Sequence, residues 1–386
     1  MIRALFVTNG HGEAAIADRI ALELRALRAD AVLDHLALVG DGTVEVMRDV
    51  GPRRAMPSGG LIAMGNVRKL AGDLRAGLLA LTRKQLKFLR GARGQYDIVV
   101  AVGDAYALIM AFCASTPTVF VGSAKSVDVT PYGPFEARLL ARAKARFVRD
   151  DATAADLRRR GVEAEVANAI VDLFAAPRSS CVTEAIAGFA PCLALFPGSR
   201  ESAYDDAPFL LRIVAALAVR RSTLGAVLSI APGLSAESFA QAARSDGWHA
   251  ESTPHELIPF VLLRDERELV RAWRGPIGPL LEHSPLVLGQ AGTANEAAAA
   301  AGVPVVAFAR ERDRKARWYR ERQRGLLGGA LAIVNGGFDQ AVAEVAAILD
   351  DPERRRRMGE IGRARMGTPG GARRIAERVV ALAAAS

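Results

Sequence analysis

The sequence predicts an α/β protein with two domains, each built on a mainly parallel sheet. Three observations predict this fold class. Short apolar runs alternate with amphipathic stretches of helical period, as buried parallel strands alternate with the helices that cover them. The alternation runs once through the first 173 residues and starts again at residue 192. A chain of 386 residues, 51% of them hydrophobic, also exceeds what one hydrophobic core usually holds.

The individual elements follow from the spacing of apolar residues. Apolar runs too short for a helix are predicted as strands, and stretches with apolar residues three or four apart are predicted as helices. The predicted strands are Ala4–Thr8, Ile98–Val102, Thr118–Val121, Leu193–Phe196, Ala226–Ile230, Val287–Leu288 and Val303–Ala309. The predicted helices are Glu13–Ala29, Ala105–Cys113, Pro134–Ala145, Pro208–Arg221 and Asn295–Ala301.

A linker separates the two copies of this pattern. Residues 177–191 contain two prolines and two serines, which interrupt regular structure. We therefore expect one domain over residues 1–175 and a second over 190–365. Open parallel sheets bind ligands at the carboxyl ends of their strands, so we expect two sheets that face an interdomain cleft.

Composition limits the classes of function and compartment. The formal net charge of +9 favours polyanionic partners, namely nucleic acid, anionic lipid or diphosphate, unless arginine is simply the preferred surface residue. Cys113, Cys181 and Cys192 are far apart among apolar neighbours, which favours small buried side chains in a reducing compartment. No signal-peptide pattern and no apolar stretch of roughly 18 residues is present. We expect a cytoplasmic protein.

Residues 61–94 interrupt the alternation of strands and helices. The segment has helical period, eight basic residues, one acidic residue and a stripe of leucines. Such a helix can lie in the interface of an anionic membrane. The alternative is a solvated helix whose leucines pack on the first sheet. The leucines are Leu70, Leu74, Leu78, Leu81 and Leu89, and the acidic residue is Asp73.

The strongest local signal follows the strand predicted to end at Phe196. Glycine at position 198 lets the backbone approach a phosphate, and Ser199 and Arg200 can bind its oxygens, arginine in bidentate fashion. The alternative is a plain turn between a strand and a helix. We assign Gly198, Ser199 and Arg200 to a candidate phosphate site.

A second glycine-rich loop, residues 289–293, leads into a predicted helix. The N-terminus of that helix presents free amides and the positive end of its dipole to a diphosphate. Glu296 can accept hydrogen bonds from ribose hydroxyls, although Asn295 or Glu296 could instead cap the helix. The candidate binding residues here are Gln290, Gly292, Thr293, Asn295 and Glu296.

Polar residues also follow two strands of the first domain. The motif TNGHGE, residues 8–13, places glycines on both sides of His11, which can act as acid or base near neutral pH. Asp104 lies two residues beyond an apolar strand and could deprotonate an acceptor hydroxyl, or could cap the next helix. Glu13 and His11 could likewise be ordinary residues of a helix start. The candidate catalytic residues are Asp104, His11 and Glu13.

Several catalytic motifs are absent from the sequence. Without an Asp-x-Asp triplet, a metal-chelated diphosphate is not expected, so helix dipoles and Arg200 would neutralise the leaving group and no metal or cofactor is predicted. HExxH, GxxxxGK[ST] and GxSxG are also missing, which argues against zinc hydrolysis, P-loop phosphoryl transfer and serine hydrolysis.

Over most of its length the chain resembles the lipid A disaccharide synthase-related family. The motifs that carry the resemblance are LFPGSRES, AGTANEAAAAAGVPVVAF, NGHGE, AVGDAY and VRDDATAADLRRRGVEAEVANAIVD, in the same order. The resemblance implies a GT-B fold with two Rossmann-like domains, the acceptor on residues 1–175 and the sugar-nucleotide donor on 190–365. The last helices resemble those of GT-B enzymes, whose C-terminal segment, here residues 366–386, returns to the first domain.

The resemblance also implies roles for single residues. Gly198, Ser199 and Arg200 would hold the donor diphosphate, with Gly292 and Thr293 beside it. Glu296 would bind ribose, and Asp104 matches the carboxylate proposed as base in the disaccharide synthases. The sequence departs from the synthases in AGTANE, where they carry a serine-glycine-threonine version, and in NGHGE, where their glycine loop is ordered differently. Lipid A itself is therefore not implied as the product.

The expected function is an inverting glycosyltransferase. It would move a hexose or N-acetylhexosamine from a UDP-sugar to a lipid or lipid-linked acceptor, with Asp104 or its rival His11 as base. The alternatives are a UDP-sugar 2-epimerase and a noncatalytic nucleotide-sugar-binding protein. Residues 61–94 would supply peripheral contact with the inner face of the membrane, and no nucleic-acid partner is expected.

Overall fold

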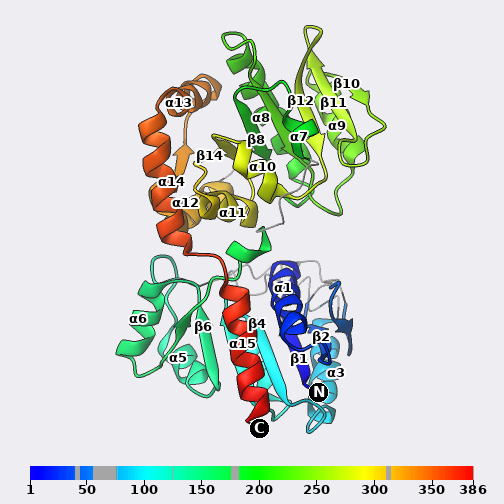
Figure 1. Ribbon diagram of the computed structural model, residues 1–386, viewed down its shortest axis with the longest axis vertical. Helices are drawn as coiled ribbons and strands as arrows, with labels where there is room; N and C mark the ends of the chain where they lie inside the picture. The colour runs from blue at the N-terminus through cyan, green and yellow to red at the C-terminus, as the bar shows by residue number, and fades with distance from the viewer. Residues whose placement is uncertain are drawn as a thin grey trace. The chain divides into compact units, whose positions relative to one another are not determined.

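The chain forms two compact α/β units, each with one mainly parallel sheet (Figure 1), which confirms the predicted fold class. Unit 1 comprises Met1–Leu173 and Thr368–Ser386, and unit 2 comprises Phe174–Gly367. The computed structural model describes residues 1–39, 44–54, 75, 77–123, 125–174, 182–309 and 314–385.

Unit 1 is built on a parallel sheet with strand order β3-β2-β1-β4-β5-β6-β7. This order sets β1 and β4, whose loops carry the candidate catalytic residues, side by side. The strands are β1 (Arg3–Thr8), β2 (Val32–Ala37), β3 (Arg48–Asp49), β4 (Ile98–Gly103), β5 (Thr118–Gly122), β6 (Ala145–Val148) and β7 (Glu165–Val166). The helices are α1 (His11–Leu27), α3 (Leu78–Gly91), α4 (Ala105–Phe112), α5 (Pro134–Leu140), α6 (Asp151–Arg159), the short η1 (Val171–Leu173) and α15 (Gly371–Ala384).

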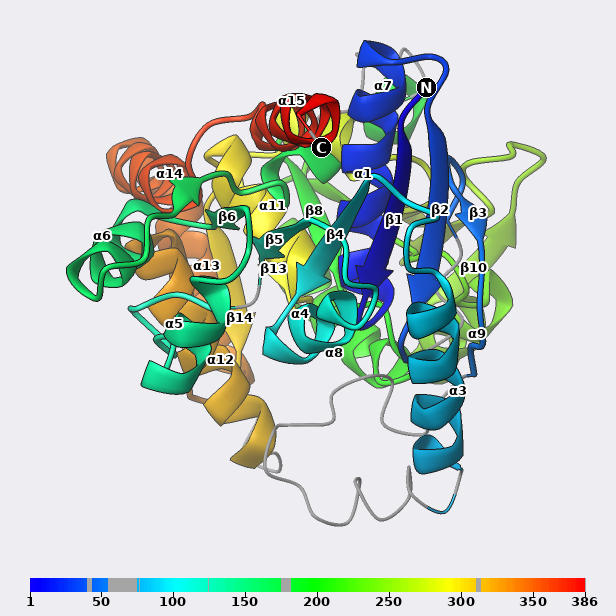
Figure 2. The ribbon, with the colours of Figure 1, turned by 90° about the horizontal axis from the view of Figure 1, so that it is seen from below.

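Helices cover both faces of this sheet. Apolar residues of α3, α4, α5 and α6 form one core with the strands, and α1 packs against α15 on the other face (Figure 2). The carboxylate of Asp172 fixes the start of α15, because its two oxygens accept hydrogen bonds from the amides of Gly370 (2.5 Å) and Ala372 (2.7 Å). The last helix of the chain is thereby part of the first unit.

Unit 2 has the strand order β10-β11-β12-β9-β8-β13-β14-β15. The pairs β10–β11 and β11–β12 are antiparallel and the others are parallel. The strands are β8 (Cys192–Phe196), β9 (Gly225–Ser229), β10 (His249–Ser252), β11 (Phe260–Arg264), β12 (Arg267–Trp273), β13 (Val287–Gly289), β14 (Val305–Phe308) and β15 (Leu331–Val334). The helices are α7 (Val182–Ile186), α8 (Ala203–Ala218), α9 (Ala236–Ser245), α10 (Ile277–His283), α11 (Thr293–Ala301), α12 (Arg314–Leu327), η2 (Gly328–Ala330), α13 (Phe338–Asp350) and α14 (Pro352–Met366).

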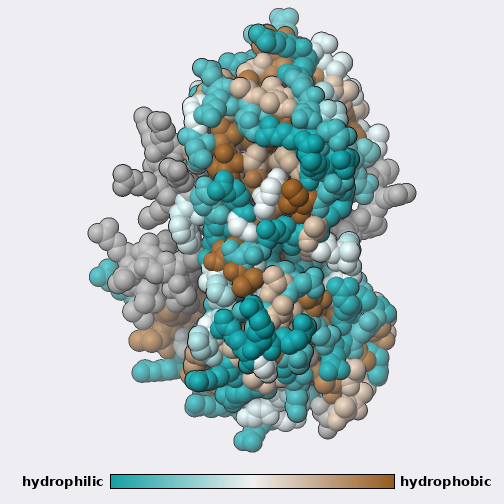
Figure 3. All heavy atoms as spheres, turned by 90° about the vertical axis from the view of Figure 1, so that its left-hand side faces the viewer, coloured by the Kyte–Doolittle hydropathy of each residue, from teal (hydrophilic) through white to brown (hydrophobic). Residues whose placement is uncertain are grey.

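Helix α14 packs along α11, and four of its arginines, Arg356, Arg357, Arg363 and Arg365, are exposed. Its buried residues are only Met358, Gly359, Gly362 and Met366. The face of the molecule shown in Figure 3 is accordingly mostly hydrophilic, with hydrophobic residues in small separate groups.

All five predicted helices have different bounds in the structure, and the two largest differences are at α5 and α8. The helix predicted over Pro134–Ala145 ends at Leu140, because Ala145 begins β6. The helix predicted from Pro208 begins at Ala203 and contains that proline in its second turn. Strand β2 was missed because it contains Asp34 and His35, which are buried but paired with polar partners.

The leucine stripe of residues 61–94 does not face outward in the part that the structure describes. Leu78, Leu81 and Leu89 are buried in the core of unit 1. In α3 the leucines therefore cover the sheet, as in the alternative of a helix packed on the first sheet, and contact of residues 61–94 with a membrane stays a prediction. Leu70 and Leu74 lie outside the described residues.

Two further expectations concern the burial of the cysteines and the absence of a membrane-spanning segment. Cys192 is buried, and burial raises the pKa of its thiol to about 12, whereas Cys113 is half-buried. Cys181 lies outside the described residues. Among the described residues, no helix is both long and apolar enough to span a membrane.

Candidate functional site

Asp104 directly follows β4 and caps α4. Its Oδ1 accepts hydrogen bonds from the backbone amides of Tyr106 (2.8 Å) and Ala107 (3.3 Å) and from Nδ2 of Asn9 (2.5 Å). Its Oδ2 receives no hydrogen bond from any residue that the structure describes. One oxygen therefore caps the helix while the other can take a proton, so the two roles that the sequence left open are compatible.

Glu13 lies in the first turn of α1, close to the same strand ends. Gly103 has a φ of +137°, and a Cβ added there would lie 3.4 Å from Cγ of Glu13 and 3.6 Å from Cβ of Asn9. Adjacent parallel strands thus bring Asn9, Glu13 and Asp104 together. His11 begins α1, but its side chain lies outside the described part of the structure, so its role as rival base stays a prediction.

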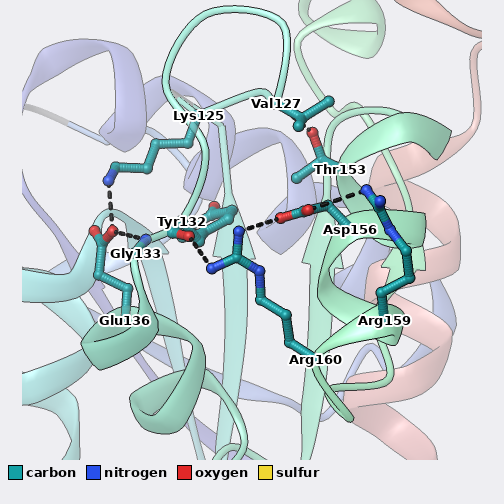
Figure 4. Close-up of polar contacts among 9 residues, drawn as sticks. All are labelled: Lys125, Val127, Tyr132, Gly133, Glu136, Thr153, Asp156, Arg159 and Arg160. Carbon is teal, nitrogen blue, oxygen red and sulfur yellow. Dashed lines mark hydrogen bonds and ion pairs between the residues drawn. The ribbon is translucent and has the colours of Figure 1, made fainter.

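The loop from β5 to α5, residues 123–133, lies at the same edge of the sheet and was not among the predicted sites. Helices α5 and α6 hold it in place (Figure 4). Lys125 Nζ contacts Glu136 Oε2 at 2.7 Å, and that oxygen also accepts a hydrogen bond from the amide of Gly133 at 2.8 Å. The amide of Val127 donates to Oγ1 of Thr153 at 3.0 Å. Polar residues directly after a buried strand, the signal that singled out Asp104, could have found this loop.

Tyr132 closes the loop with its ring inside the unit. The ring meets Phe120 edge-on with centroids 6.2 Å apart, and the carbonyl accepts a hydrogen bond from Arg160 (Figure 4). The hydroxyl is buried without a hydrogen-bond partner among the described residues. Burial, and then the charges of Glu136 and Asp104, raise the pKa of this hydroxyl. It therefore stays protonated beside the candidate base.

A buried histidine ties together the ends of three strands of unit 1. Nε2 of His35 lies 2.9 Å from Oγ1 of Thr8, and Nδ1 lies 2.9 Å from Oδ1 of Asp49. Burial lowers the pKa of His35, although Asp49 opposes this effect. The imidazole is therefore neutral at pH 7 and holds the residue that precedes Asn9.

In unit 2 the two candidate donor loops follow adjacent parallel strands. Gly289 at the end of β13 pairs with Phe196 at the end of β8, and the amide of Gln290 donates to the carbonyl of Phe196 at 2.8 Å. Residues 197–200 and 289–293 therefore leave the sheet side by side. The structure thus brings together two loops that are far apart in the sequence.

The loop after β8 turns at Gly198, whose φ of +126° is accessible mainly to glycine. Ser199 and Arg200 follow and are exposed. Arg200 forms no ion pair with the residues that the structure describes. Its guanidinium is therefore available to an anionic ligand.

Helix α11 begins without a side-chain cap, because its N-cap is Gly292. The first amides of the helix have no intrahelical partner, and together with the helix dipole they favour an anion at this end. Thr293 is exposed at the first position, and Glu296 is half-buried in the first turn.

Two residues predicted to contact the donor have side chains that brace the loop instead. Asn295 is fully buried, and its Nδ2 donates to the carbonyl of Gly289 (3.2 Å) and to Gln323 (3.1 Å). The side-chain amide of Gln290 pairs with the backbone of Phe308 through two hydrogen bonds of 3.0 and 3.2 Å. We therefore correct the prediction of direct side-chain contact for both residues, since their polar groups are engaged inside the unit.

Helix α12 supplies two residues that sequence reasoning missed. Nε2 of Gln323 donates to the carbonyls of Ala291 (3.2 Å) and Gly292 (3.0 Å) and so shapes the start of α11. Tyr319 is 42% exposed, and its hydroxyl would lie 2.9 Å from a Cβ added to Gly292. The segment RWYRERQRG did not indicate a functional site, because its sequence is that of an ordinary charged helix. In the described residues no group of three or more His, Cys, Asp or Glu side chains could hold a metal.

Comparisons with known proteins give structural matches only. No protein-family model matches the chain, and no curated protein matches it. Among solved structures, UDP-GlcNAc 2-epimerase from Neisseria meningitidis bound to UDP-GlcNAc matches with a TM-score of 0.59 and 14% identity, over 98% of this chain and 100% of that chain.

Two further solved structures match over nearly the whole chain. UDP-GlcNAc 2-epimerase from Methanocaldococcus jannaschii matches with a TM-score of 0.57 and 14% identity, over 99% of this chain and 100% of that one. A spinosyn forosaminyltransferase matches with a TM-score of 0.58 and 16% identity, over 99% of both chains. The chain therefore has the GT-B-like fold that these nucleotide-sugar epimerases and glycosyltransferases share.

Proposed function

We propose that this chain is an enzyme that acts on a UDP-sugar, with the nucleotide bound by unit 2. The observation that carries the proposal is the uncapped N-terminus of α11 beside the loop that holds Arg200. Free amides, a helix dipole and an exposed guanidinium form a site for a diphosphate. The similarity in fold to an epimerase solved with UDP-GlcNAc supports the choice of ligand.

Each candidate residue has a role in this proposal. Arg200 and Ser199 bind the diphosphate oxygens, while Gly198, Gly292 and Thr293 offer backbone amides. Glu296 accepts hydrogen bonds from ribose. No metal is needed in this scheme, because the guanidinium and the helix end supply the positive charge that the leaving diphosphate requires.

The comparisons support epimerisation at the sugar better than transfer. Epimerases and a transferase match with similar TM-scores. Inversion at a carbon of the sugar needs a group that moves a proton, and Oδ2 of Asp104 is available for that step.

Transfer to a second substrate is the other candidate reaction. It is favoured by the forosaminyltransferase match and by the resemblance to the lipid A disaccharide synthase-related family. Asp104 would then take the proton of an acceptor hydroxyl on a lipid or lipid-linked sugar, and the oxygen would attack the anomeric carbon.

Ligand binding and product analysis test both parts of the proposal. Calorimetric titration with UDP, UDP-GlcNAc, UDP-glucose and GDP-mannose, without and then with magnesium, should show metal-independent binding of UDP and one UDP-sugar. NMR of the bound sugar nucleotide without acceptor should then show a C2 epimer if the enzyme is an epimerase. No epimer alone, but turnover once a lipid-linked acceptor is added, would identify a transferase. Binding without either reaction would contradict the proposal that the chain is an enzyme and would favour a nucleotide-sugar-binding protein.

A further inference from the structure

Helix α3 has one apolar face and one basic face. Its apolar face is buried in unit 1, as described above. The exposed face carries four basic side chains, Arg83, Lys84, Lys87 and Arg90. Helix α3, which is labelled in Figure 2, therefore has a positively charged exposed face.

These four cations have no ionic partners within the described part of the chain. The sequence contains no acidic residue between Asp73 and Asp97 that could neutralise them. Helix α14 shows the opposite arrangement, because Arg354 pairs with Glu344 and Arg356 pairs with both Glu353 and Glu360. Arg354 and Arg356 on α14 are thus neutralised locally, and the four exposed cations on α3 are not.

A cavity of about 490 Å³ opens beside this basic face. Its lining includes the basic residues Lys84 and Lys87 and the apolar residues Phe88 and Pro52. The wall is fixed, because Nε2 of the buried Gln85 donates to the carbonyl of Pro52 at 3.0 Å and to two carbonyls at the end of β2. The cavity is therefore preformed and amphiphilic.

We propose that this face of α3 docks on an anionic phospholipid bilayer and that the cavity receives one lipid headgroup with the adjoining apolar part. Cations and apolar surface in one cavity match an amphiphilic anion, whereas nucleic-acid phosphates would leave the apolar lining unused. Leu79, 61% exposed on the same helix, adds apolar surface at the edge of the contact. Since the leucine stripe is buried, attraction between charges dominates the binding, which is therefore sensitive to salt.

Vesicle co-sedimentation of the full chain tests the proposal. The protein should sediment with vesicles of phosphatidylglycerol and phosphatidylcholine at low salt and should not sediment with phosphatidylcholine alone. The double variant Lys84→Glu with Lys87→Glu should lose at least about thirtyfold in affinity, from the usual contribution of each basic residue near an anionic surface. The control variant Arg138→Glu with Lys144→Glu changes net charge equally at exposed positions of unit 1 and should lose less than about threefold.

Three results would overturn the proposal. The wild-type chain could fail to sediment with anionic vesicles, the two double variants could lose affinity equally, or duplex DNA could bind at lower concentrations than the vesicles and displace them. The last result would assign the face to nucleic acid. UDP titration of both variants serves as a check on folding, because neither changes a residue assigned to the nucleotide site.

Discussion

Asn9 donates a hydrogen bond from Nδ2 to Oδ1 of Asp104 at 2.5 Å, across the ends of two adjacent parallel strands. The same oxygen accepts two amides of α4. Three donors thus orient the carboxylate through Oδ1. Its second oxygen, Oδ2, receives no hydrogen bond from the residues that the structure describes. Substitutions of Asp104 that keep its capping role but remove its role as base can test whether it has both roles.

Asp104→Asn should abolish turnover while leaving the fold intact. Asparagine caps a helix as well as aspartate does, so the free energy of unfolding should change by less than about 0.5 kcal/mol. Turnover should fall about 10²- to 10⁴-fold, because the amide cannot accept the proton. UDP affinity, measured by calorimetry, should not change.

Asp104→Ala is the matched variant for the capping role. It should destabilise the chain by about 1 kcal/mol through the lost cap, in addition to the loss of turnover. Full activity of Asp104→Asn would exclude the carboxylate as the base.

Arg200→Ala should weaken UDP binding. Hydrogen bonds to charged groups contribute about 1.5–3 kcal/mol, so affinity should fall roughly 10- to 100-fold with little change in stability at this exposed position. The control is Arg220→Ala, an exposed arginine of the same unit at the end of α8. Equal affinities for the two variants would remove Arg200 from the nucleotide site.

Gln323→Leu should lower both stability and UDP affinity. The change removes the donors to the carbonyls of Ala291 and Gly292 and leaves buried polar groups unpaired, which costs about 1–3 kcal/mol. The exposed Gln241→Leu on α9 is the control and should stay within about 0.5 kcal/mol of the wild type. If chemical denaturation shows a lower stability but UDP affinity is unchanged, Gln323 braces the fold without shaping the ligand site.

His35 should make the folded state sensitive to acid. Because burial lowers the pKa of His35 in the folded chain, the unfolded chain binds more protons below the ordinary histidine pKa of about 6.5. The free energy of unfolding should therefore fall as pH decreases from 7.5 to 5. His35→Gln should flatten this dependence, whereas His249→Gln, at a side chain that is 72% exposed, should not. Parallel pH profiles for all three proteins would contradict the assignment.

The fold was predictable because most of the central parallel strands are continuous apolar runs, as in Ile98–Gly103. Strand β2 escaped prediction because Asp34 and His35 are buried with partners from distant segments, and no local pattern reveals such partners. Strand β10 was missed for a different reason, since His249–Ser252 is an exposed edge strand with a polar sequence.

The site was predictable as loops but not as side-chain orientations. The backbone has unusual dihedral angles at Gly198 and Gly292, and glycine indicates such angles in any sequence. Asn295 was expected to face a ligand, yet its side chain points into the unit. There it donates a hydrogen bond to Gln323, 28 residues further along the chain. Contacts between α11 and α12 depend on how the helices pack, which the sequence does not encode locally.

The attachment of α15 to unit 1 has a consequence for how the protein is made. Residues 1–173 are synthesised before unit 2, yet one face of their sheet is covered by α15, which follows unit 2 in the chain. Domains of most proteins fold in order of synthesis. Here the amides that meet Asp172 are synthesised only after all of unit 2, so unit 1 can be completed only after unit 2 has been translated.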